Sequence, residues 1–217
     1  MSRLRGIIAV TDRGWYDFLR EEPGLDEVNF WKPSSRRGVR APPFTPFLFK
    51  LRSPDNAICG FGYFACYSRL PAWLAWETFG RANGCASFRE MEERISTIRE
   101  RIRYEEGGGP DEIGCVLIAQ PVFFPEEGWV RQPSDWPIRT QTEKSYSLVS
   151  GEGARVWQQC LGIANDIAAS TVGAELRPRY GDPTLVHPAW DRASSELRSR
   201  RLMQARARSR MSTHFPR

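Results

Sequence analysis

Two apolar runs that lie close together in the chain most constrain its fold. FTPFLFKL (44–51) and AICGFGYFACYS (57–68) each have the length and apolar content of a buried strand, and a segment with Pro, Asp and Asn separates them. We therefore expect two strands of one sheet. Gly60 and Gly62 inside the second run predict either a bulge or a place where a ligand or another backbone approaches closely.

Aromatic residues are dense across residues 26–80, and a basic, Pro-rich loop at 32–46 interrupts them. Aromatic rings can stack on a nucleobase, while cations and hydroxyls hold phosphates. Core packing is the ordinary alternative for each ring, and a solvated loop is the alternative for 32–46. Alternation along 26–31 places Phe30 and Trp31 on opposite faces, and we expect Trp31 to face a cavity.

Further elements follow from periodicity and capping signals. A strand is expected at 6–10, followed by a helix that begins after Thr11 or Asp12 and stops at Pro23. The capping box Ser87-x-x-Glu90 predicts an amphipathic helix that runs to about residue 102. A short helical turn at 71–80, a central strand at 113–124 and a second long helix near 153–169 complete the expected elements.

Length and composition bound the class of protein. The 217 residues suffice for one sizeable domain with a tail, or for two small domains. The five cysteines are odd in number and lack CxxC spacing, which favours reduced thiols over disulfides or zinc ligands. No apolar run approaches the roughly 20 residues that span a bilayer, and the start lacks a signal cleavage site. We expect a cytoplasmic, nucleoid-associated protein with no membrane partner.

Charge points weakly to a polyanion. The formal net charge is +5, and from about residue 188 the chain becomes Arg-rich with few apolar anchors. We expect one folded domain over 1–187, and a tail over 188–217 with non-specific affinity for nucleic acid.

Several segments resemble a known family when they are taken in order. VNFWKPS, the FLFKL–PDN–ICGFGYFACYSRLP pair and the AWETFG–NG turn resemble the N-terminal module of a family of bacterial HNH restriction endonucleases. IGCVLIAQPVFFPEEGW and GEGARVW fit the same family, so the resemblance covers roughly residues 7–187. That module belongs to the PUA-like group, alongside SRA (YDG), EVE and YTH domains. The resemblance implies an α/β (α+β) fold, with a curved mixed sheet or open β-barrel and flanking helices.

The resemblance also implies a function, because these domains flip a modified base into an aromatic pocket. We expect binding to double-stranded DNA that carries a modified base, with 5-methylcytosine as the preferred candidate. The expected base pocket comprises Asn29, Trp31, Tyr63, Phe64, Tyr67, Ser68 and Trp76. The expected contacts to the DNA backbone come from Lys32, Ser34, Ser35, Arg36, Arg37 and Arg40.

Catalytic chemistry is hard to place in this sequence. The chain has two histidines, His187 and His214, and the Arg-rich tail stands where the family's HNH nuclease domain would begin. No P-loop or GxGxxG motif occurs. We therefore expect no catalytic residues, no metal site and no cofactor.

Three alternatives stay open from the sequence. One is a modification-dependent endonuclease that uses Mg²⁺ or Mn²⁺ held by acids alone, such as Asp12, Asp17, Asp26, Glu77 or Glu126. The second is an RNA-binding module, since PUA and YTH relatives bind RNA. The third is an interaction module that binds no nucleic acid.

Overall fold

One mixed sheet organises the chain. The computed structural model describes residues 4–35, 38–101, 112–137 and 142–171. Its strands are β1 (Arg5–Thr11), β2 (Glu27–Lys32), β3 (Thr45–Leu51), β4 (Ala57–Pro71), β5 (Glu112–Phe123), β6 (Val130–Arg131) and β7 (Glu143–Ser147). The strand order is β2-β5-β4-β3-β1-β7, and β6 pairs with β4. β1 and β3 run parallel, whereas the other pairs are antiparallel.

The two apolar runs form the β3–β4 hairpin at the centre of this sheet, as predicted. The register of β4 shifts twice against β5, between Phe61 and Tyr63 and between Phe64 and Cys66. Such bulges increase local twist and bend the strand. At Gly60 a Cβ would lie 2.3 Å from the Val122 carbonyl oxygen, so the close backbone approach expected at this glycine is confirmed.

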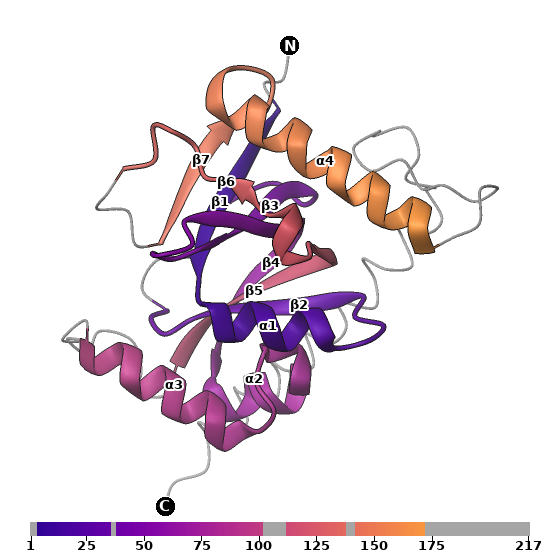
Figure 1. Ribbon diagram of the computed structural model, residues 1–217. Coiled ribbons are helices and arrows are strands. Elements are labelled where there is room, and N and C mark those ends of the chain that lie inside the picture. Colours follow the sequence, from indigo (N-terminus) through magenta and orange to yellow (C-terminus); the bar gives the residue numbers. More distant parts are fainter. Residues whose placement is uncertain (1–3, 36–37, 102–111, 138–141, 172–217) are drawn as a thin grey trace, which may run out of the picture.

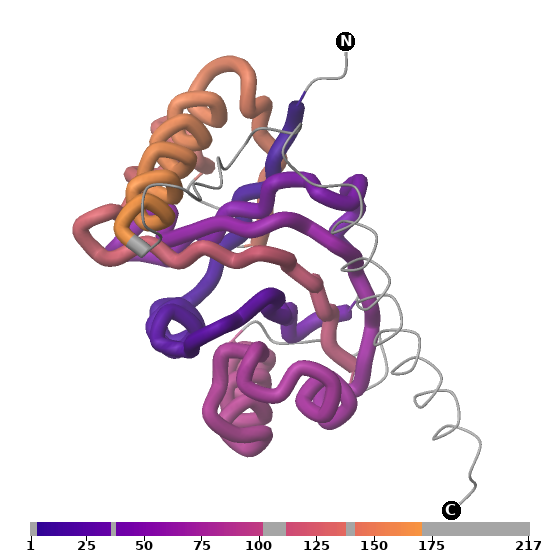
Figure 2. The backbone as a smooth tube through the Cα atoms, turned by 90° about the vertical axis from the view of Figure 1, so that its right-hand side faces the viewer, coloured from indigo at the N-terminus to yellow at the C-terminus, as the bar shows by residue number. Residues whose placement is uncertain are grey.

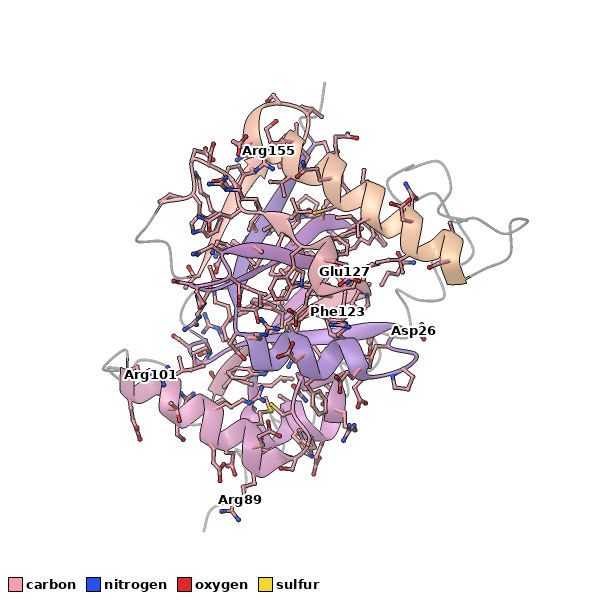
Figure 3. All side chains as sticks on the ribbon, viewed as in Figure 1. Asp26, Arg89, Arg101, Phe123, Glu127 and Arg155 are labelled. Carbon is pink, nitrogen blue, oxygen red and sulfur yellow. The ribbon has the colours of Figure 1, made fainter. Side chains whose placement is uncertain are left out.

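Within the described residues, four α-helices and two short 3-10 turns connect and cover the sheet. They are α1 (Arg13–Glu21), α2 (Ala72–Phe79), η1 (Gly80–Asn83), α3 (Phe88–Arg101), η2 (Glu126–Gly128) and α4 (Gly151–Thr171). Asp12 caps α1 by accepting a hydrogen bond from the Trp15 amide at 2.9 Å. Ser87 Oγ accepts from the Glu90 amide at 3.2 Å, which confirms the predicted N-terminus of α3. Figure 3 places Arg89 and Arg101 at opposite ends of α3.

The helices pack against different parts of the sheet (Figures 1 and 2). α1 shares a cluster with side chains such as Phe30, Phe47 and Phe49. α4 covers a second cluster, in which Trp157 meets Phe61 edge to face at 5.0 Å. α2 and α3 cover a third cluster that includes Trp31. Phe30 and Trp31 therefore contact different clusters, as alternation along β2 predicted.

The curved sheet brings its two outermost strands together at one end. Lys32 is the last residue of β2 and Glu143 is the first residue of β7, and their side chains form an ion pair at 2.9 Å. No backbone ladder joins β2 to β7 within the described residues. We call this Lys32–Glu143 junction the seam. The sheet is thus an open barrel whose edges meet through side chains at the seam.

The predicted fold class is confirmed: the chain is α+β, with a curved mixed sheet and flanking helices. The sequence did not predict β7, because EKSYS is a polar segment in which only Tyr146 is buried. α4 is longer than the predicted helix at 153–169. The proposed domain boundary at 187 and the Arg-rich tail lie outside the described residues. In the described part, no helix is long and apolar enough to cross a membrane.

Candidate functional site

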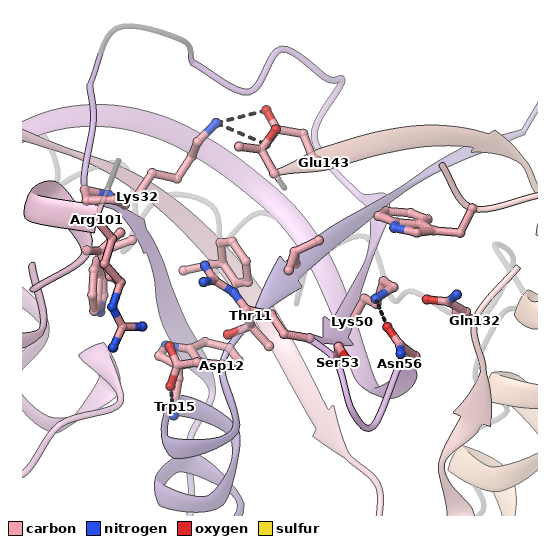
Figure 4. Close-up of a pocket in the computed structure, with 18 residues that line it drawn as sticks. Thr11, Asp12, Trp15, Lys32, Lys50, Ser53, Asn56, Arg101, Gln132 and Glu143 are labelled. Atoms are coloured by element: carbon pink, nitrogen blue, oxygen red, sulfur yellow. Dashed lines mark hydrogen bonds and ion pairs between the residues drawn. The ribbon is translucent and has the colours of Figure 1, made fainter. Parts of the chain in front are cut away.

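A cavity of about 740 Å³ lies beside the seam. The ends of β1, β2 and β3 line it, together with the start of α1, the end of α3 and the segment around 132–136. This volume lies within the roughly 300–1,000 Å³ typical of small-ligand sites. Figure 4 shows the seam on one side of this space, with Lys50, Asn56 and Gln132 grouped on another.

Four aromatic side chains line the cavity: Trp15, Phe30, Trp31 and Trp136. All are largely buried, and neighbours hold them in place. Trp31 Nε1 donates to the Asn83 carbonyl at 2.9 Å. Trp136 stacks on Tyr146, with ring centroids 6.3 Å apart and planes at 14°. The cavity therefore has fixed aromatic surfaces.

Lys50 is the most unusual residue of the site. It lies within the apolar run FLFKL on β3 and is only 3% exposed, although it lines the cavity. Its ammonium group donates to the Leu51 carbonyl at 2.9 Å and more weakly to Asn56 Oδ1 at 3.4 Å. It also lies 5.3 Å from the centroid of the Trp136 ring. Burial lowers the pKa of Lys50 below its usual 10.5.

No carboxylate of the described residues pairs with Lys50. A buried cation without a counter-charge is costly and therefore uncommon in a core. The ammonium group is thus a candidate contact for a ligand oxygen, because an incoming acceptor would replace the water that the cation has lost.

The remaining charges give the cavity a positive surplus. Lys32, Arg52 and Arg101 add to Lys50, whereas Asp12 and Glu143 are the only carboxylates among the described lining residues. Glu143 is paired with Lys32, and Asp12 caps α1. Arg52 and Arg101 are exposed at the cavity. This arrangement suits an anionic ligand that enters from solvent.

Two further polar atoms of the lining residues lack a hydrogen-bond partner in the described part. They are Trp15 Nε1, a donor, and Gln132 Oε1, an acceptor. Gln132 is placed beside Asn56, because its backbone amide donates to the Asn56 carbonyl at 3.2 Å. Buried polar atoms are normally paired, so an orphan acceptor at a cavity is a candidate ligand contact.

Of the predicted base-pocket residues, the structure brings only Trp31 to this cavity. Asn29 is buried elsewhere, with Nδ2 donating to Asn83 Oδ1 at 2.8 Å. The Tyr67 hydroxyl donates to the Ser35 carbonyl at 3.0 Å. The others are also absent from the lining and pack in or against the three clusters or the sheet: Tyr63, Phe64, Ser68 and Trp76.

Of the predicted phosphate contacts, the structure brings only Lys32 to the cavity. Ser35 is fully buried, and Ser34 is half-buried away from the lining. Arg40 is exposed but lies outside the lining. Arg36 and Arg37 lie outside the described residues.

Sequence reasoning missed most of the polar lining. Lys50, Asn56, Arg101 and Gln132 come from separate segments, and only the tertiary fold gathers them. One signal was available: a lysine within an apolar strand run is unusual and is a reason to expect a function.

The thiols and acids form no metal centre in the described part of the chain. All five cysteines are free, as the sequence predicted. Burial raises the pKa of the Cys85 thiol to about 11 and that of Cys115 to about 12. These thiols are protonated at neutral pH and have little nucleophilic character.

Comparisons with known proteins give similarities of structure. No family model matches the chain, and no curated protein matches it. The crystal structure of ASCH from Zymomonas mobilis is 12% identical, with a TM-score of 0.45 over 75% of this chain and 96% of that chain. A tyrosine-to-phenylalanine mutant of ZmASCH is 11% identical, with a TM-score of 0.43 over 69% of this chain and 94% of that chain.

Proposed function

We propose that this chain is a PUA-like nucleic-acid-binding module that takes one base out of its stack into the cavity beside the seam. The observation that carries the proposal is that one cavity of about 740 Å³ combines aromatic walls with a surplus of cations. Bases stack on aromatic rings, and phosphates bind cations, so nucleic acid satisfies both halves of this lining.

The positions of the groups fit a nucleotide. Arg52 and Arg101 are exposed and can bind phosphates that remain in solvent. Lys50 and Trp136 are buried, and they suit the base. Removing a base from its stack costs a few kcal/mol, which stacking of about 1–3 kcal/mol per base together with hydrogen bonds can offset.

The preferred nucleic acid is double-stranded DNA that carries 5-methylcytosine. Apolar contact with one methyl group is worth about 1–3 kcal/mol, so we expect selectivity over cytosine of roughly 10–200-fold. RNA is the alternative ligand, and the binding assay distinguishes the two directly.

The test is fluorescence anisotropy at near-physiological salt with labelled, otherwise identical probes. The probes are duplex DNA with cytosine, 5-methylcytosine, 5-hydroxymethylcytosine or N6-methyladenine, and RNA of the same sequence. Trp136→Leu keeps apolar volume but removes the ring, and we expect about 5–150-fold weaker binding, the equivalent of 1–3 kcal/mol. Trp31→Ala is a poorer probe, because it also removes the hydrogen bond to the Asn83 carbonyl and packing in the cluster beneath α2 and α3.

The matched control compares two arginines on the same helix. Arg101 lines the cavity, whereas Arg89 lies at the other end of α3 and pairs with Glu93. Arg101→Met is expected to weaken binding to every probe and to lower the salt slope by about 1, while Arg89→Met leaves both unchanged. Equal effects of the two changes, or no effect of Trp136→Leu, would overturn the proposal. Tighter binding to RNA than to any of the DNA duplexes would identify RNA as the ligand.

A further inference from the structure

Lys50, Asn56 and Gln132 form a compact polar group at one end of the cavity (Figure 4). We infer that this group recognises a base edge that carries both a carbonyl oxygen and an N–H donor, so that the site prefers cytosine, guanine and thymine or uracil to adenine. The inference rests on the proposed function and specifies which bases the cavity accepts.

The Lys50 ammonium group sets the first requirement. An ammonium group donates and never accepts, so its ligand partner must be an acceptor. Its present acceptors are one backbone carbonyl at 2.9 Å and one amide oxygen at 3.4 Å, which leaves donor capacity on a nitrogen with three protons. A carbonyl oxygen is a stronger acceptor for a cation than a ring nitrogen of adenine. Lys50 therefore favours bases that carry a carbonyl.

Gln132 sets the second requirement. Its Oε1 atom is buried and lacks a donor in the described part of the chain. An amide oxygen accepts only, so the ligand must bring an N–H group. The backbone N–H of Gln132 donates to the backbone carbonyl of Asn56, and this hydrogen bond holds Gln132 close to the Lys50–Asn56 pair. The ligand must therefore carry its acceptor and its donor on the same edge.

Three kinds of base meet both requirements. Guanine presents O6 beside N1–H, and thymine and uracil present carbonyls beside N3–H. Cytosine carries O2 and an amino group at the two ends of the same edge, with the N3 acceptor between them. Adenine offers an amino donor but has no carbonyl. A site that hydrogen-bonds one edge discriminates against an analogue that leaves a buried group unpaired.

The experiment uses strands that contain a single base. Fluorescein-labelled pentamers carry four abasic sites around a central A, C, G or T, and a fifth pentamer is wholly abasic. All five present the same phosphates, so anisotropy differences at 50 mM salt report the base alone. We expect the full chain to bind C, G and T at least about 10-fold more tightly than A or the abasic strand.

Three substitutions locate the preference. Lys50→Met is expected to bring C, G and T to the affinity of A, and Gln132→Leu to reduce their advantage by at least about 5-fold. Gln158→Leu makes the same change on the exposed face of α4, and it should alter nothing.

Each other outcome is informative. Equal affinity for all four bases, above that of the abasic strand, overturns the inference but leaves the proposed function in place. A preference for A also overturns it. Equal affinity for all five strands, or no binding to any, rejects base insertion itself and with it the proposed function.

Discussion

Replacing Lys50 with methionine should make the protein more stable while weakening its binding. Lys50 is 3% exposed and has no carboxylate partner among the described residues. Desolvating an ion costs several kcal/mol, whereas losing its one hydrogen bond of ordinary length, at 2.9 Å, costs about 1.5–3 kcal/mol. Methionine has a similar length and no charge. The difference favours the variant by about 1–2 kcal/mol in the free energy of unfolding.

The pH dependence of this gain follows from the direction of the pKa shift. Burial lowers the pKa of Lys50 in the folded state below its usual 10.5, so the unfolded chain binds more protons between the two values. Wild-type stability attributable to Lys50 therefore rises with pH through that window. The advantage of Lys50→Met should be largest at neutral pH and should narrow as pH approaches 10.5.

Thermal unfolding at pH 7 and at steps up to pH 10 measures both effects. For a chain of this length, 1 kcal/mol corresponds to about 2–4 °C, so Tm should rise by about 2–8 °C at pH 7. Lys50→Arg, which keeps the charge, should show no such rise. A Lys50→Met variant that unfolds below the wild type would identify Lys50 as a structural residue and refute the reasoning that assigns it to a ligand.

Three further predictions concern the fold, the first with a matched control substitution. Gly84→Ala should lower the free energy of unfolding by more than about 2 kcal/mol, because φ is +76° and the new Cβ would lie 2.3 Å from Trp15 Cδ1. Gly24→Ala, at φ +68° with open space around it, should cost only about 1–2 kcal/mol. Denaturant titration measures both losses, and equal losses would contradict this prediction. Glu143→Gln removes the ion pair at the seam and should lower the free energy of unfolding by about 1–2 kcal/mol. It should also speed amide hydrogen exchange in β7. Unchanged exchange would show that the seam does not hold β7. Arg155, one turn along α4, and the Ser134 amide lower the pKa of Glu152 to about 2. The Tm of Glu152→Gln should therefore lie below that of the wild type by a constant amount above about pH 5, and this difference should vanish as pH falls to 2. A difference that persists at pH 2 would refute this origin.

Local patterns predicted those parts of the fold in which one segment carries its own signal. The β3–β4 hairpin follows from two apolar runs, and α3 follows from the Ser87–Glu90 capping box. β7 carries no such signal, because EKSYS is polar apart from Tyr146 and its ladder partner β1 lies at the opposite end of the described chain. Such a strand can be predicted only when the position of its partner strand is already known.

The candidate site was less predictable than the fold. Trp31 and Lys32 were predictable from the sequence, because both lie in the stretch that combines aromatic and basic residues. Phe64 and Tyr67 lie in the same stretch, but Phe64 packs in the cluster that contains Phe30, and Tyr67 packs against that cluster, outside the cavity lining. Gln132 has no distinctive neighbours in sequence, and its unpaired oxygen is a property of its surroundings alone.

The position of β1 between β3 and β7 has a consequence for the order in which the site can form during synthesis. Arg5 hydrogen-bonds to Ser145 across 140 positions, so β1 gains its second neighbour only when nearly all of the folded part has been made. The β3–β4 hairpin is complete much earlier, and its aromatic side chains precede the strand that closes the seam. A nascent chain that ends before Glu143 therefore has the aromatic residues of β2 but no closed cavity. The base binding that we propose would then require that β7 has left the ribosome.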